Sequence, residues 1–311
     1  MGSRSSCAAQ AADAVSALTG HAIGPSRNKR VFAAAADELQ RGHADCFAAH
    51  YAHPEVPESA NTAVISVDAL SLRLRHEGFK QATVATVTLL DAAGSPVLWG
   101  WPGSTERTHT LRIAEMPQAG KRDIMERVEQ EVQALLAAKP ELSLQVVIDG
   151  APDLRNHLQE RFPQALHLTD LYHVLEHLGD ALRHLFADDD ARRLREKVRW
   201  AHKLKHIPGS DRRLVRWLRA YARRSDDPLL SYARREVDKH VEYIHRQGAF
   251  LDYPKALAER ASLGSGRVEA ACKTLVTQRL KVSGASWSRA GGAAVLFVRE
   301  GDAELGAALL V

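Results

Sequence analysis

Three acidic side chains have the type and the surroundings that a two-metal phosphoryl-transfer site requires. Asp68 interrupts the Val/Ile-rich run 64–70, and Asp149 ends the apolar run 144–148. Both runs are typical of buried strands, whereas Glu269 stands near the start of a predicted helix. Two divalent cations about 4 Å apart need converging carboxylates to hold them against a phosphodiester. The three acids therefore indicate metal-dependent chemistry on DNA.

Each acid also has an ordinary structural explanation when it is taken alone. An acid that follows a strand, as Asp149 does, often caps a helix or forms a turn, and Glu269 alone would usually be an exposed helical residue. Asp68 is less ordinary, because a carboxylate within an apolar strand is costly unless it is paired or bound to a metal. Only the joint position of the three residues favours a catalytic role.

The hydrophobic pattern predicts an α/β fold. Strands are predicted at 63–74, 82–90, 97–101, 144–148 and 165–168. Helices are predicted at 121–138 and 152–159, followed by a helical stretch at 171–247 with breaks near 208–209 and 226–228. This order predicts an RNase H-like fold, in which a mixed five-stranded sheet is flanked by helices. In that fold the first acid belongs on the central strand, the second at the end of the fourth strand, and the third on a helix across the sheet.

The chain is expected to have four parts. These are a short N-terminal helical or irregular region at 1–60, the first part of the RNase H-like core at 61–179, an all-helical basic insertion at 180–255, and the rest of the core with the last catalytic helix and the tail at 256–311. The insertion accounts for the long separation between Asp149 and Glu269.

Composition excludes several classes of protein. The chain has 311 residues, of which 45% are hydrophobic and 26% charged, as in ordinary globular proteins. No apolar stretch approaches the roughly 18 residues of a membrane span, and residues 1–10 lack the apolar core of a secretory signal. Cys7, Cys46 and Cys272 are far apart, which argues against a disulfide framework or a zinc ribbon. A reducing cytoplasm is the expected compartment.

Basic residues gather in one part of the chain, although the net charge is only +4. Segment 192–246 is crowded with Arg and Lys and is interleaved with Trp200, Trp217, Tyr221, Tyr232 and Tyr243. Such a face suits the phosphate backbone of a nucleic acid. A solvated helical hairpin with aromatic residues in its core would have the same pattern, so both interpretations stay open.

Several separate blocks of the sequence carry a family resemblance. They are 147–151 (VIDGA), 162–165 (FPQA), 170–177 (DLYHVLEH) and 264–281 (GSGRVEAACKTLVTQRLK), followed by Ser283-Gly284 and Trp287. In this order they resemble bacterial insertion-sequence transposases of the Kra type, which belong to the Mutator-like group of DDE transposases. The resemblance covers about residues 62–299.

The resemblance implies that Asp68, Asp149 and Glu269 bind two Mg²⁺ or Mn²⁺ ions and catalyse DNA cleavage and strand transfer of an insertion sequence. One ion would activate water or a DNA 3′ hydroxyl, and the other would stabilise the leaving oxygen. Asp170 and His173 would be the Asp-x-x-His signature of Mutator-like enzymes. His173 would contact a phosphate or steady a carboxylate; alternatively, Asp170 and His173 would form a buried hydrogen bond that fastens a helix to the sheet.

The implied partner is double-stranded DNA, both transposon ends and target, bound by a homo-oligomer in the bacterial cytoplasm at the nucleoid. Four basic residues flank Glu269 and are candidates for phosphate contacts, namely Arg267, Lys273, Arg279 and Lys281. The chain departs from the family pattern at its short N-terminal region, at Ala69 where Gly is expected, and in its Ala/Leu-rich tail after Arg299. These departures leave the activity of this short form open.

Two other functions fit parts of the pattern. The short N-terminal region is compatible with an inactive or truncated transposase-derived DNA-binding protein, although such a protein has no need of three acids. The run His173-Val174-Leu175-Glu176-His177 also matches the H-x-x-E-H pattern of an inverted zinc metalloprotease. In that motif two histidines four residues apart on a helix face one zinc ion.

Overall fold

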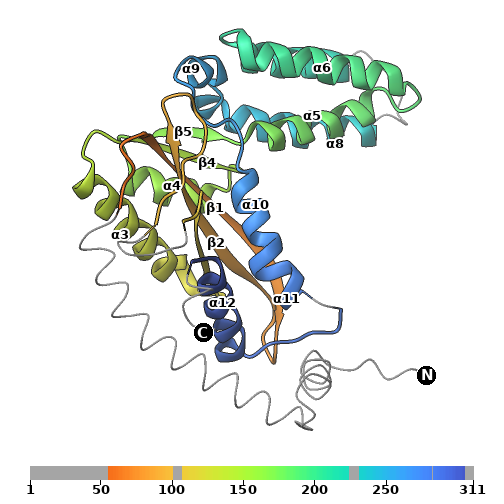
Figure 1. Cartoon of the computed structure of the whole chain (residues 1–311). Coiled ribbons are helices and arrows are strands. Elements are labelled where there is room, and N and C mark those ends of the chain that lie inside the picture. Colours follow the sequence, from red (N-terminus) through yellow and green to blue (C-terminus); the bar gives the residue numbers. More distant parts are fainter. Residues whose placement is uncertain (1–54, 101–106, 224–230, 282, 305–311) are drawn as a thin grey trace.

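A computed structural model of the chain describes residues 55–100, 107–223, 231–281 and 283–304. Figure 1 shows a twisted sheet with helices on both faces and a second group of helices at one end of it. The predicted N-terminal region 1–60 lies almost wholly outside the described residues. The predicted helix break at 226–228 and the end of the tail lie outside them as well.

A mixed five-stranded sheet forms the centre of the α/β fold, as the sequence predicts. Its strands are β1 (Ala60–Leu74), β2 (Gly78–Asp91), β3 (Leu111–Glu115), β4 (Ser143–Ile148) and β5 (Leu166–Thr169). They lie in the order β3-β2-β1-β4-β5. The β1–β2 and β2–β3 pairs are antiparallel, and the β1–β4 and β4–β5 pairs are parallel. The longest strand, β1, is therefore central, with the acid-bearing β4 beside it.

The prediction of a third strand at 97–101 is wrong, because Leu111–Glu115 forms β3 instead. Val97 donates one backbone hydrogen bond to Leu89 after the turn at Gly94, and the chain then leaves β2. Trp99 makes only an isolated bridge to Thr108. The apolar run has strand character, but the free edge of β2 is taken by the later segment.

The described helices fall into two groups. Those on the sheet are η1 (Ala119–Lys121), α3 (Arg122–Ala138), α4 (Pro152–Arg161), α10 (Gly266–Ala271), the π-helical segment η4 (Cys272–Thr277), α11 (Gln278–Leu280) and α12 (Arg289–Glu304). The others, here called the helical unit, are α5 (Leu171–Leu185), α6 (Asp190–His206), α7 (Ser210–Ala222), α8 (Ser231–Arg246), η3 (Gly248–Phe250) and α9 (Tyr253–Ala258). Among the described residues no helix combines the length and the apolar character needed to cross a bilayer.

Two apolar layers hold helices on opposite faces of the sheet. On one face Ile65 of β1 and Val146 of β4 pack with Val128 of α3 and Leu158 of α4. On the other face Leu72 and Leu74 of β1 pack with Val268, Leu275 and Leu280 of the α10–α11 helix. Side chains of a strand alternate between its two faces, so each strand contributes to both layers.

The helical unit has an apolar core of its own. Leu178 of α5, Trp200 of α6, Leu214 of α7 and Val241 of α8 are all buried in it. The unit includes α5, so the chain leaves the sheet at Leu171, close after β5, and returns to it at α10. An all-helical region thus separates the last strand from the helix that carries Glu269.

Replacing Ile65 by Ala should lower the free energy of unfolding by about 2–5 kcal/mol, because it leaves a cavity at a fully buried position of the central strand. Val198→Ala, at an exposed position of α6, is the control and should stay within about 0.5 kcal/mol of the wild type. Urea titration followed by circular dichroism measures both. Equal effects of the two substitutions would contradict the assignment of the core.

Candidate metal centre

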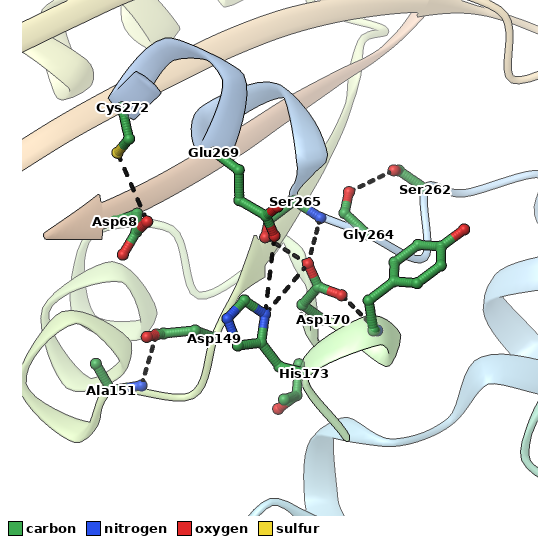
Figure 2. Close-up of polar contacts among 12 residues, drawn as sticks. Asp68, Asp149, Ala151, Asp170, His173, Ser262, Gly264, Ser265, Glu269 and Cys272 are labelled. Carbon is green, nitrogen blue, oxygen red and sulfur yellow. Dashed lines mark hydrogen bonds and ion pairs between the residues drawn. The ribbon is translucent and has the colours of Figure 1, made fainter. Parts of the chain in front are cut away.

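Strand pairing brings Asp68 and Asp149 to the same place. β1 and β4 are parallel with Ile65 beside Val146, and the same register continued for three residues reaches the two acids. Ile65 and Val146 face α3 and α4, so side-chain alternation turns both acids toward the opposite face. Adjacent strands lie about 4.8 Å apart, and Figure 2 shows both carboxylates on the side where α10 packs.

Asp68 is a partly buried carboxylate with few donors. Its Oδ1 accepts the Ala69 N–H at 2.6 Å, and its Oδ2 lies 3.6 Å from the Cys272 thiol, which donates to it. Burial raises the pKa of Asp68 above its usual range, and the charge of Asp149 adds to the effect. Burial also raises the pKa of the Cys272 thiol, which therefore acts as a neutral donor.

Asp149 lies in a turn whose backbone carbonyls accept hydrogen bonds from the helical unit. Its Oδ1 accepts the Ala151 N–H at 3.0 Å, and its backbone carbonyl accepts a hydrogen bond from the Tyr243 hydroxyl of α8. Gly150 follows with a φ of +93°, and a Cβ there would meet the Gln247 side chain at 2.7 Å. Only glycine fits this position without strain.

The loop 262–265, which leads into α10, is fixed to the sheet at several points. The buried Gln145 amide of β4 donates to the Ser262 carbonyl at 2.6 Å and accepts the Ser262 N–H at 2.9 Å. The N–H of Leu171 donates to the carbonyl of Leu263 at 2.9 Å. These bonds set where α10 begins and hence where Glu269, near its start, projects.

Asp170 completes the attachment of this loop. It is fully buried at 0% exposure and caps α5 by accepting the Tyr172 N–H at 2.6 Å on Oδ1. Its Oδ2 accepts the Ser265 N–H at 2.7 Å and also the Ser265 hydroxyl. Burial acts to raise the pKa of Asp170, but the approach of His173 and the hydrogen bonds from Ser265 and Tyr172 outweigh it and lower the pKa. Asp170 is therefore an ionised clamp between the starts of α5 and α10.

His173 stands between two carboxylates. Its Nδ1 lies 3.6 Å from Asp170 Oδ2 and 4.0 Å from Glu269 Oε1. This nitrogen is buried, and no described atom is close enough to form an ordinary hydrogen bond with it. The interaction with Asp170, opposed by burial, raises the pKa of His173 to about 9. The ring is therefore cationic at neutral pH without a metal, and its use as a metal ligand would release a proton.

One group of described residues could hold a metal ion. Single ligand atoms of Asp170, His173 and Glu269 lie within 4.8 Å of one another. Asp68 and Asp149 lie outside this tightest group, although Figure 2 shows them facing the same region. Burial raises the pKa of Glu269, and the charges of Asp170 and, less strongly, Asp68 add to the shift. A cation here would relieve the repulsion among these carboxylates.

The donor set suits a hard cation, but its members are not equivalent. Asp170 Oδ2 already accepts two hydrogen bonds from Ser265, so Asp170 has little capacity left for a metal. Asp68 and Glu269 have raised pKa values, as expected of carboxylates that await a cation, and among the described residues Asp68 accepts only the Ala69 N–H and the long contact from the Cys272 thiol. Oxygen ligands of this kind fit Mg²⁺ or Mn²⁺.

The four predicted phosphate-binding residues all lie exposed along the α10–α11 helix. Arg267 follows the first residue of α10, Lys273 is in the π-helical segment, Arg279 is in α11 and Lys281 follows it. Arg267 approaches the Thr110 hydroxyl at 3.4 Å. The helix that carries them runs from α10 through the π-helical segment to α11, alongside the sheet (Figure 1).

A buried polar network beside Asp149 escaped the sequence analysis. Thr169 Oγ1 donates to Gln247 Oε1 at 3.0 Å and accepts from Arg155 Nη2 at 2.7 Å. Gln247 Nε2 donates to the Gly150 carbonyl at 3.1 Å, and the Tyr253 hydroxyl donates to the Thr169 carbonyl at 2.9 Å. Burial lowers the pKa of Arg155 to about 10. No short sequence pattern pairs side chains that are so far apart in the chain.

The two histidines of the H-x-x-E-H pattern do not face one site. His173 Nδ1 is directed at Asp170 and Glu269. The ring of His177 instead stacks on Tyr243 with centroids 3.7 Å apart, and its Nδ1 lies 2.9 Å from Nδ1 of His240. This arrangement does not favour the zinc metalloprotease.

Gln247→Leu should destabilise the protein, because the apolar side chain leaves the Gly150 carbonyl without its donor and the Thr169 hydroxyl without its acceptor. Each buried polar group left without a partner costs about 1–3 kcal/mol, and Gln247 is only 7% exposed. Gln133→Leu, at an exposed position of α3, is the matched control. A free energy of unfolding equal to that of the control variant would rule out the network as a stabilising tie.

The His177–His240 pair should make the protein less stable as the pH falls from 7 toward 5. Burial lowers the pKa of both rings, and the His240 charge adds to the shift at His177. The unfolded chain therefore binds protons at a higher pH than the folded protein, which favours unfolding below about pH 6.5. His240→Gln should reduce this loss, whereas His245→Gln, exposed on the same helix, should not. Thermal unfolding across this pH range measures the slopes, and parallel slopes would refute the expectation.

No protein-family model matches this chain, and no curated protein matches it. A function has therefore to be inferred from the site itself. The residues that carry the inference are Asp68, Asp149, Asp170, His173 and Glu269.

Proposed function

We propose that the protein is a DDE-type DNA transposase that cleaves and joins DNA with two Mg²⁺ or Mn²⁺ ions held by Asp68, Asp149 and Glu269. The observation that carries the proposal is the meeting of these three acids, from two neighbouring strands and one crossing helix, on one face of the sheet (Figure 2). The pKa values of Asp68 and Glu269 are raised, and perturbed pKa values of this kind gather at functional sites.

The topology supports an RNase H-like identity for this fold. Three antiparallel strands are followed by two parallel ones in the order β3-β2-β1-β4-β5, which is the arrangement of RNase H-like domains. The first acid then lies on the central strand and the second just past the end of β4. The blocks that resemble Kra-type transposases contain Asp149 and Glu269 and give the same assignment.

Each residue of the site would have a separate role in phosphoryl transfer. Bound metal ions would activate a water molecule or a 3′ hydroxyl and neutralise charge on the leaving oxygen. Asp68, Asp149 and Glu269 supply the oxygen ligands. Asp170 keeps Glu269 in place through Ser265, and a protonated His173 has an N–H available to a phosphate oxygen near Glu269.

Charge along the molecule supports DNA as the substrate. The exposed side chains of Arg267, Lys273, Arg279 and Lys281 lie on the helix that carries Glu269 and suit contacts to phosphates. Helices α6 and α7 carry eleven basic and three acidic side chains, an excess larger than the +4 of the whole chain. Arg195, Arg212 and Arg216 are exposed there, with no acidic partner among the described residues. Such a surface attracts a nucleic acid backbone.

The proposal includes the setting in which a transposase works. The DNA would be the transposon ends and the target, bound by a homo-oligomer at the nucleoid in the bacterial cytoplasm. The metal-dependent joining of a 3′ hydroxyl to a phosphodiester is the reaction that separates a transposase from a simple nuclease. Both reactions can be measured on the same plasmid.

The test is nicking of a supercoiled plasmid, and joining of a 3′-hydroxyl oligonucleotide to it, in Mg²⁺ or Mn²⁺. Asp149→Asn and Glu269→Gln should each lower both rates by at least about 100-fold, the scale of losing one group that acts in the transition state. DNA binding measured by fluorescence anisotropy should be retained. Glu126→Gln, at an exposed acid of α3, is the control and should match the wild type.

Two results would overturn the proposal. Unchanged nicking by Asp149→Asn and Glu269→Gln would remove the acids from the reaction. A wild-type protein that binds DNA without nicking or joining it would instead be a transposase-derived DNA-binding protein. Stoichiometric zinc in the purified protein together with no DNA cleavage would favour the metalloprotease.

A further inference from the structure

Tyr172 is a large aromatic side chain that stays exposed beside the candidate metal centre. It is 61% exposed, whereas Leu171 and Val174 on either side of the same helical turn are buried. Its backbone N–H is bound to Asp170 Oδ1, and the same carboxylate approaches His173. The backbone of Tyr172 is therefore held in place beside the cluster of Asp170, His173 and Glu269.

Gly264 supports this ring from one side. A Cβ built on Gly264 would lie 2.8 Å from both Cδ2 and Cε2 of Tyr172 and 3.7 Å from Asp170 Oδ1. The tyrosine thus lies against bare backbone of the loop that leads into α10, where any larger residue would displace it. A ring supported in this way loses little conformational freedom when a flat ligand stacks on its open part.

We propose that Tyr172 is a stacking platform for an unpaired nucleobase next to the phosphate that reacts. The proposal rests on the proposed function, because it takes nucleic acid as the substrate. Both faces of a base inside a duplex are already covered, so only a base that has left the stack can use the platform. Aromatic stacking accepts every base, which suits a position set by the reacting phosphate rather than by sequence.

The chain offers a matched control for this residue. Tyr232 of α8 is exposed to nearly the same extent, at 60%. Its ring contacts His184 at 6.4 Å between centroids, on a part of the helical unit away from Asp170. Substitution of either tyrosine removes an exposed ring, so only the position differs between the two variants.

The experiment measures binding of a single-stranded oligonucleotide that contains 2-aminopurine, and of a duplex of the same sequence, with Ca²⁺ in place of Mg²⁺. Tyr172→Ala should weaken single-strand binding by about 5- to 100-fold and abolish the quenching of 2-aminopurine, while duplex binding stays unchanged. Tyr172→Phe should retain both properties, because stacking needs the ring and not the hydroxyl. Tyr232→Ala should behave as the wild type.

The outcomes separate this proposal from the proposed function. The platform is refuted if Tyr172→Ala binds the single strand and quenches 2-aminopurine as the wild type does, or if it weakens binding of single strand and duplex equally. In either case, nicking of DNA by the wild type would leave the transposase proposal intact. If the wild type quenches 2-aminopurine through Tyr172 but never nicks DNA, the platform holds and the enzyme proposal fails. Equal effects of Tyr172→Ala and Tyr232→Ala would also refute the platform.

Discussion

The carboxylate of Asp170 is the interaction on which the site depends. It is fully buried, and its hydrogen bonds join the first turn of α5 to Ser265 at the start of α10. An ionised carboxylate is tolerated there because backbone N–H groups, a hydroxyl and the cationic His173 compensate its charge. Together with the hydrogen bonds of Gln145 to Ser262, this clamp sets the position of α10, and hence of Glu269, relative to the strands.

A second set of hydrogen bonds joins the helical unit to the backbone around Asp149 and Asp170. Tyr243 and Gln247 reach from α8 and its C-terminal end to the carbonyls of Asp149 and Gly150. Tyr253 reaches the carbonyl of Thr169 at the end of β5. The two strand ends that precede Asp149 and Asp170 are therefore held by α8, the residue after it, and α9 of the helical unit. Any ligand that shifts the helical unit also shifts these backbone groups.

The sequence predicted the mixed five-stranded sheet at the centre of the fold. The positions of Asp68 and Asp149 were expected from the order of elements in an RNase H-like fold, and in the structure the register of β1 and β4 turns both side chains toward one face. The edge strand was misplaced because Val97-Leu98-Trp99 has strand character, and only pairing with β2 decides which segment takes the edge. Tertiary context of this kind overrides local preference.

The tight group around Glu269 was predicted only in part. Asp170 and His173 were named because the family resemblance implies them, and Asp170 joins α5 to the loop before α10 through Ser265 rather than through a hydrogen bond to His173. Its partner Ser265 lies in the glycine-flanked turn before α10, but nothing local connects the two residues. The ties of Gln145 to Ser262 and of Gln247 to Thr169 join residues far apart in the chain. Such side-chain pairs become visible only once the strands are assembled.

The chain enters the helical unit at Leu171 and leaves it at Leu263, and these two residues share a backbone hydrogen bond. Because the two ends of this segment are joined, its length can change without moving the sheet, and the closure cost of a flexible loop rises by only about 0.6 kcal/mol for each doubling of its length. The shared core of α5, α6, α7 and α8 confines such changes to the loops between these helices. The anchor points at Tyr243, Gln247 and Tyr253 set the limit of that freedom.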